Sequence, residues 1–239
     1  NVPLALDTSN KKAIEAGISV YNRSKGKPIV NSADAAGRIE YVDLAAANDA
    51  IVIALCNGEG IAKDNDERMM YCQTLLERGM EHGMEPTDLW FDPLFLVVKG
   101  MQDKQMEVLE CIKMFSDMGL NSTGGLSNNS NGMPKNIRPI MDSALVAMAM
   151  MQGLTSAIVN PNDLRLMETI KSCDVFKGNT LYADSYLELY SLNLAGFPLM
   201  VPQRLRKPEA PSGVFLSKSG KIKKAENIYD WGIYRLWQK

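Results

Sequence analysis

Histidine, paired cysteines and long apolar runs are scarce or missing in this sequence of 239 residues. The single histidine, His82, leaves little room for a histidine-ligated metal site or for Ser-His chemistry. The four cysteines are widely scattered and form no C-x-x-C pair, which argues against a zinc or iron–sulfur site and favours reduced thiols in a cytosol. They are Cys56, Cys72, Cys111 and Cys173.

No apolar run approaches the roughly 18 to 20 residues that a membrane-spanning helix needs. The first ten residues, NVPLALDTSN, lack the basic, apolar and cleavage regions of a signal peptide. We therefore expect a soluble, cytoplasmic protein with no membrane partner. An apolar content of 46% suits one large α/β domain, or at most two small ones.

Charge is distributed unevenly along the chain, although the net charge is only −2. From residue 201 onward there are nine Lys/Arg and three Asp/Glu, a local charge of +6. We expect a main domain at residues 1–194 and a basic extension at residues 195–239. The extension is either a solvated tail or a docking segment for an acidic partner, and nothing else in the sequence suggests a nucleic-acid ligand.

Short apolar runs of strand length alternate with helix-like stretches of 10 to 16 residues, the pattern of parallel β/α units. The predicted strands lie at residues 2–6, 28–30, 50–55, 89–91, 123–126 and 156–159. The predicted helices lie at residues 11–20, 33–47, 66–81, 104–118, 139–153 and 163–173.

Each predicted strand leads into an aspartate or asparagine, and these six residues are Asp7, Asn31, Asn57, Asp92, Asn128 and Asn160. Helix N-capping favours the same residue types, so it is the alternative explanation for any single position. In a β/α barrel, however, the carboxyl ends of the strands form the floor of the active site. A ring of amides and carboxylates suits a neutral ligand with many hydrogen-bonding edges. It suits a phosphate poorly, since no glycine-rich cradle is present.

Several motifs occur in the order that is found in methyltetrahydrofolate:corrinoid/iron–sulfur protein methyltransferases, which are pterin-binding TIM barrels. The motifs are LALDTSNKKAIEAG, PIVNSAD, GIAKDNDER, FDPL, GGLSNNSNG, RPIMDSALVAMAMMQGLTSAI and YADSYLELY. The resemblance covers roughly residues 2 to 190. It implies a (β/α)8 TIM barrel fold.

The resemblance also implies a set of ligand-binding residues. Asp7, Asn31 and Asp92 match the side chains that grip the pterin ring, while Asn128 matches the residue that approaches N5 of the folate. Arg138 corresponds to an arginine further along the same loop, although this chain has two extra residues before it. Ser127 and Asn57 complete the expected substrate-binding set.

The implied reaction moves the N5-methyl group between methyltetrahydrofolate, or a related tetrahydropterin, and the cobalt of a corrinoid (cobalamin) on a partner protein. The resemblance implies no directly bound metal and a homodimer. A hydrogen bond from Asn128 would stabilise N5 as charge gathers there, by the logic of an oxyanion hole. The direction of transfer stays open.

Two other functions remain as alternatives. A dihydropteroate synthase would need a lysine on the seventh strand of its barrel and a late Arg-x-His. The stretch here is GLSNNS, and no histidine follows residue 82. A non-catalytic barrel subunit that only holds a corrinoid partner would not need to keep the pterin-gripping set.

The chain departs from the family at both ends. The family barrel has two strands before the one that ends at Asp7, so we expect a barrel that lacks its first two strands, with the gap filled by preceding residues, another chain or the tail. In the tail, GVFLSKSGKIKK predicts a hairpin around Ser219 and Gly220. The spacing of Trp231, Tyr234 and Trp237 indicates one aromatic helix face, packed on the barrel or docked on a partner.

Overall fold

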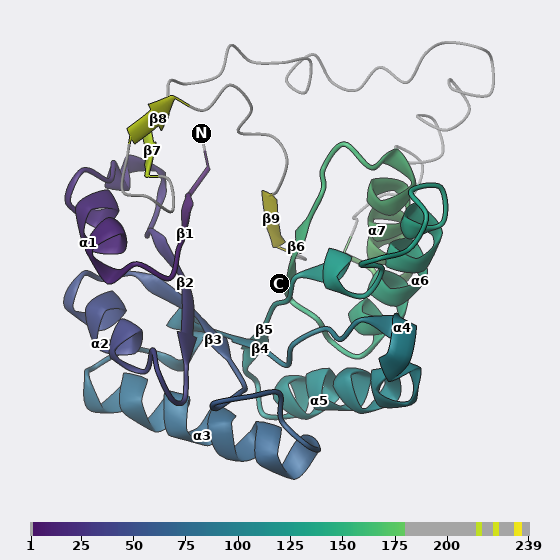
Figure 1. The fold of residues 1–239 in the computed structure, drawn as a ribbon, viewed down its shortest axis with the longest axis horizontal. Helices are drawn as coiled ribbons and strands as arrows, with labels where there is room; N and C mark the ends of the chain where they lie inside the picture. The colour runs from purple at the N-terminus through teal and green to yellow at the C-terminus, as the bar shows by residue number, and fades with distance from the viewer. Residues whose placement is uncertain (1, 180–213, 217–221, 225–231, 236–239) are drawn as a thin grey trace.

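A computed structural model describes residues 2–179 together with the backbone of residues 214–216, 222–224 and 232–235. Five parallel strands form a sheet in the order β1-β2-β3-β4-β5, which is also the order along the chain. A parallel bridge between Gly125 and Ile158 carries the arrangement on to β6. The strands curve around a common interior, with the helices on the outside (Figure 1). This is the topology of a β/α barrel.

The parallel strands are β1 (Ala5–Asp7), β2 (Ile29–Asp34), β3 (Ile51–Leu55), β4 (Leu89–Asp92), β5 (Asn121–Ser122) and β6 (Ser156–Val159). The α-helices are α1 (Lys11–Ser19), α2 (Glu40–Ala47), α3 (Asn65–Glu81), α4 (Val98–Met101), α5 (Gln105–Asp117), α6 (Arg138–Met151) and α7 (Leu164–Phe176). Short 3-10 turns are η1 (Arg23–Lys25), η2 (Pro86–Asp88), η3 (Gln102–Lys104) and η4 (Leu126–Asn128).

Alternation along the strands sends side chains to two different cores. Val30, Val52 and Phe91 face outward and pack against the helix layer. Their sequence neighbours Ile29, Ile53 and Trp90 face inward and form a separate apolar cluster inside the curved sheet. Ala5, Ile51, Leu55 and Ile158 pack around that inner cluster. The strands β2, β3 and β4 are therefore largely buried on both faces, which explains why their runs are mostly apolar.

Several predicted boundaries were wrong, including the strands predicted at residues 2–6 and 28–30, which are Ala5–Asp7 and Ile29–Asp34. The predicted helix at residues 33–47 begins only at Glu40, because Ala33 and Asp34 continue β2 and pair with Ala54 and Leu55 of β3. Asn31 consequently lies within β2 and does not close it. The predicted strand at residues 123–126 is also displaced: β5 is Asn121–Ser122, and Leu126 already begins η4.

The C-terminal extension contains three described strands. β7 (Val214–Leu216) pairs antiparallel with β8 (Ile222–Lys224), which confirms the predicted hairpin. β9 (Gly232–Arg235) pairs antiparallel with β6 and lies between β6 and β1 (Figure 1). The predicted aromatic helix was therefore wrong at Tyr234, which belongs to β9, while Trp231 and Trp237 lie outside the described residues. The expected domain boundary after residue 194 also lies outside them.

None of the helices in the described ranges combines the length and apolar character that a membrane crossing requires.

Candidate functional site

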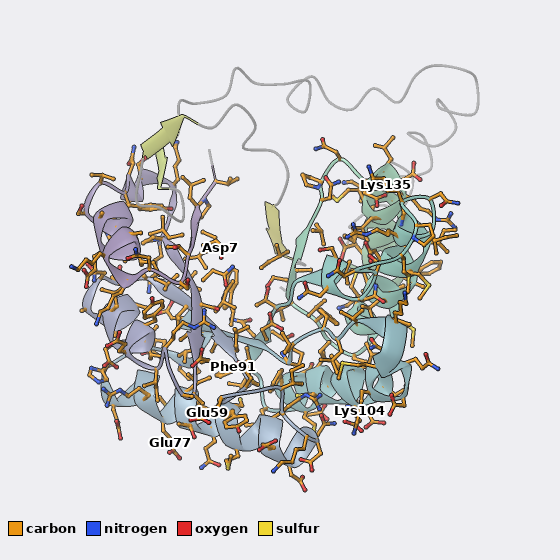
Figure 2. The ribbon with its side chains drawn as sticks, viewed as in Figure 1. Asp7, Glu59, Glu77, Phe91, Lys104 and Lys135 are labelled. Carbon is orange, nitrogen blue, oxygen red and sulfur yellow. The ribbon has the colours of Figure 1, made fainter. Side chains whose placement is uncertain are left out.

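Polar side chains lie next to the inner apolar cluster, on its side towards the carboxyl ends of the strands. Asp7 follows Ala5 by two residues, and Asn31, Asp92 and Asn160 follow Ile29, Trp90 and Ile158 by the same interval. Side chains two residues apart in a strand point to the same face. These four polar residues therefore face the interior, and Figure 2 shows Asp7 on the inner side of β1. Glu77 and Lys104, by contrast, lie on the outer rim (Figure 2).

None of the six Asp and Asn residues that were predicted at strand ends caps a described helix. The N-caps of α1, α3 and α7 are Asn10, Asp64 and Asp163, whose side chains accept backbone N–H groups at 3.3, 2.9 and 3.1 Å. The helices α2, α5 and α6 have no side-chain cap. Helix capping therefore does not explain these six residues, and ligand binding remains a possible role for their side chains.

Asp92 is the most buried carboxylate of the set. Its side chain is 5% exposed, and its Oδ1 atom accepts the N–H of Leu94 at 2.8 Å. No cation pairs with it in the described part of the chain. Burial raises the pKa of Asp92 to about 7, and the bond from Leu94 opposes the shift only in part. A carboxyl in this state gains the most from a ligand that offers two N–H groups to its free edge.

Asp7 and Asn31 are direct neighbours, since they are Cα partners in the β1–β2 register. Burial by the surrounding protein raises the pKa of Asp7, and the nearby charge of Arg38 lowers it in part, although the residue keeps contact with solvent. Arg38 is itself held by Asp34, whose Oδ2 atom accepts the Nε–H at 2.7 Å. The side-chain amide of Asn31 makes no hydrogen bond to the described residues.

Asn57 lies beyond β3, beside Asp92. The carbonyl of Asp92 accepts the N–H of Cys56 at 2.9 Å, so the two strand ends are joined. The Oδ1 atom of Asn57 is buried and has no hydrogen-bond partner among the described residues. An orphaned buried acceptor is costly, and a bound ligand is one explanation for it.

The turn that carries Asn128 is shaped by Gly124 and Gly125. A Cβ atom on Gly124 would meet Phe95 at 2.5 Å and the Asp92 Oδ1 atom at 3.3 Å. A Cβ atom on Gly125 would meet the Asn128 Nδ2 atom at 3.2 Å. The two glycines therefore allow Asp92 and Asn128 to lie against the same short piece of backbone. The Asn128 side chain is exposed and makes no hydrogen bond to the described residues.

The remaining expected residues are placed less centrally. Ser127 is half-buried in η4 next to Asn128. Arg138 begins α6, and its Nε–H donates to the Ser130 hydroxyl at 3.1 Å. The neighbouring Asn129 is buried and donates to Asp142 at 2.9 Å, so it is a structural residue. Asn160 uses its Oδ1 atom to accept the N–H of Asn162 in a local turn.

Sequence reasoning missed Thr123, which follows β5 and is fully buried. Its hydroxyl oxygen, like the Asn57 amide oxygen, has no partner among the described residues. A threonine after a short polar strand carries no signal by itself, because an orphaned hydroxyl is visible only once the neighbouring strands are in place.

Comparison with known proteins matches residues 1–160 to the family described as pterin binding enzyme. This chain belongs to the pterin-binding enzyme family. A methylcorrinoid:tetrahydrofolate methyltransferase of Eubacterium limosum is 23% identical over 197 residues, which are 79% of this chain and 70% of that protein. The expected family is thereby confirmed.

Solved structures with the same fold include a dihydropteroate synthase of Yersinia pestis bound to a pterine-sulfa conjugate. Its TM-score is 0.59 at 17% identity, over 74% of this chain and 70% of the other. A dihydropteroate synthase of Coxiella burnetii in complex with pteroic acid gives a TM-score of 0.59 at 16% identity, over 74% and 68% of the two chains. At these identities the likeness shows the fold alone, and it confirms the expected barrel class.

Proposed function

We propose that this pterin-binding protein moves the N5-methyl group between methyltetrahydrofolate, or a related tetrahydropterin, and the cobalt of a corrinoid on a partner protein. The observation that carries the proposal is a set of Asp and Asn side chains near the strand ends that cap no helix. Asp7, Asn31, Asp92 and Asn160 face the interior, and Asp92 and Asn57 supply buried acceptors. The methyltransferase relative from Eubacterium limosum supports the corrinoid and folate chemistry.

The acceptors match one edge of a reduced pterin, which presents a ring N–H and an exocyclic amino group side by side. Asp92 would take both donors in two parallel charge-assisted bonds, each contributing about 1.5–3 kcal/mol. Asp7 and Asn31, paired across β1 and β2, would bind the opposite side of the ring system. An amide suits a ring edge whose nitrogens alternate between donor and acceptor, since it supplies both roles.

Asn128 would act at the reacting nitrogen. When the methyl group leaves, the electron pair of the broken N–C bond stays on N5, and the new bond forms between the methyl carbon and Co(I). The Asn128 Nδ2–H₂ group would donate to N5 as that electron density builds up. The amide is exposed and without a partner in the described chain, so it is available to substrate. Because an amide does not release a proton near neutral pH, the proton that N5 finally takes would come from water or a carboxyl group.

The test is a titration of the protein with methyltetrahydrofolate, with and without cob(I)alamin, followed by optical spectroscopy. Appearance of methylcobalamin supports the proposal. If the protein instead consumes methylcobalamin in the presence of tetrahydrofolate, the methyl group moves in the opposite direction, from cobalt to folate. Tight folate binding without methyl transfer in either direction would leave a binding-only barrel subunit. Absence of folate binding would sink the proposal.

A further inference from the structure

Thr123 lies beside Asp92 on the interior face of the sheet. The backbone N–H of Thr123 donates to the carbonyl of Phe91 at 2.9 Å, so the β4–β5 ladder continues past the register pair of Phe91 and Ser122. In that register Trp90 faces Asn121 inside the sheet, and alternation brings Thr123 to the same face. Gly125, two residues further, bridges to the inward-facing Ile158 and confirms the alternation.

The Thr123 hydroxyl has no hydrogen-bond partner among the described residues, although the side chain is 0% exposed. Leaving a buried hydroxyl unpaired costs free energy that a valine of the same shape would avoid. On the adjacent strand β4, Asp92 has an edge that Leu94 does not bind, and beyond the next strand, β3, the buried Asn57 Oδ1 atom has no partner among the described residues. Three consecutive strands, β3, β4 and β5, thus each carry an unused polar atom at or just past their carboxyl ends.

The identity of these groups indicates what they would bind. Asn57 Oδ1 and the Asp92 carboxylate accept hydrogen bonds, so the ligand edge that faces them carries N–H groups. Once Asp92 is ionised, the Thr123 hydroxyl is the one of these three groups that has a hydrogen to donate, and a hydroxyl rotates to suit its partner. On a pterin, the carbonyl at C4 lies next to the ring N–H that a carboxylate would bind.

We propose that Thr123 is a specificity-determining residue whose hydroxyl donates a hydrogen bond to the C4 carbonyl oxygen of the bound pterin. This inference rests on the proposed pterin ligand and adds a contact to it. The hydroxyl is kept unpaired in the free protein because it is completed only when the ligand arrives. Thr123 would therefore contribute to affinity at the expense of the stability of the free protein.

The experiment compares Thr123→Val, which keeps the shape, with Thr123→Ser, which keeps the hydroxyl. Ser143→Ala is the matched control, because Ser143 has a buried hydroxyl without a partner among the described residues and lies on α6. Methyltetrahydrofolate binding is measured by calorimetry, and the melting temperature is measured without ligand. We expect Thr123→Val to weaken binding about tenfold without lowering the melting temperature. Thr123→Ser and Ser143→Ala keep wild-type affinity.

A second arm identifies the ligand atom. Pterin is compared with 4-thiopterin, whose sulfur accepts hydrogen bonds poorly. The exchange weakens binding to the wild type and has a much smaller effect on Thr123→Val. Equal affinity of the wild type and Thr123→Val for methyltetrahydrofolate would overturn this inference and leave the proposed function standing. A wild-type protein that binds no pterin at all overturns both.

Discussion

Replacement of the buried Asp92 by asparagine measures how much the ionised carboxylate lowers the free energy of unfolding. Asparagine keeps the size of the side chain and an oxygen to accept the N–H of Leu94. The native pKa of about 7 exceeds the ordinary value of 3.8, so the native state holds this proton more tightly than the unfolded chain does. Stability from this group is complete below about pH 4 and declines as the pH rises towards 7.

The size of the effect follows from that difference in pKa. At about 1.4 kcal/mol for each pH unit, the ionised carboxylate destabilises the native state by up to about 4 kcal/mol at pH 8. We expect Asp92→Asn to be more stable than the wild type by several kcal/mol at pH 8 and by only about 1 kcal/mol at pH 4.5. Urea unfolding followed by circular dichroism gives both values.

A surface variant separates this effect from general consequences of charge removal. Asp117, which pairs with Lys113 on the surface of α5, is 63% exposed, and Asp117→Asn is expected to change stability by less than about 1 kcal/mol at either pH. The reasoning fails if Asp92→Asn gains no stability at pH 8, or if its gain is the same at pH 4.5.

Three further outcomes are expected. Methyltetrahydrofolate affinity of the wild type falls about tenfold for each pH unit below 7, because the ligand donors need the ionised Asp92, and calorimetry on Asp92→Asn shows a flat profile instead. Asn128→Ala lowers the single-turnover rate of methyl transfer about a hundredfold, with a smaller change in folate affinity. Asn131→Ala, in the exposed part of the same loop, transfers the methyl group at the normal rate. An unchanged rate for Asn128→Ala would refute the N5 role. Gly124→Ala destabilises the fold by about 1–3 kcal/mol, because its Cβ would lie 2.5 Å from Phe95. Gly37→Ala, whose Cβ would have nothing within 4 Å, leaves the melting temperature nearly unchanged. Equal melting temperatures for the two variants would contradict the packing argument.

The strand positions followed well from apolar runs, because strands buried on both faces must be apolar throughout. The strand at residues 156–159 was predicted with the bounds it has in the structure. β5 escaped the same reasoning because Asn121 and Ser122 are polar. Hydroxyl groups hold its backbone in place: the side chains of Thr155 and Ser156 donate to the Ser122 carbonyl at 2.7 and 3.1 Å.

The start of α2 shows how tertiary pairing overrides local preference. Ala33 and Asp34 open a stretch with good helical composition, yet their pairing with β3 keeps them extended. Asp34 then accepts the N–H groups of Ala36 and Arg38 at 3.1 and 3.0 Å, which organises the connection before the helix. No sequence pattern announces a ladder partner that lies some twenty residues away.

At the candidate site, residue types at strand ends were predictable and their electrostatic state was not. Asp7 and Asp92 end their strands as the alternation of strands and helices predicts, whereas Asn31 lies inside β2 and Asn128 lies in η4, beyond the end of β5. The raised pKa of Asp92 and the unpaired hydroxyl of Thr123 depend on how completely neighbouring strands enclose them. The roles of the four residues in binding and catalysis remain predictions for the experiments above.

Separate residues start the helices and line the interior, and this division has a consequence for how the protein tolerates change. Asn10, Asp64 and Asp163 anchor α1, α3 and α7, so an exchange at Asp7, Asn57 or Asn160 removes no helix cap. New ligand preferences can therefore be acquired one side chain at a time at the mouth while the architecture beneath survives, which makes this scaffold a suitable starting point for altered pterin selectivity.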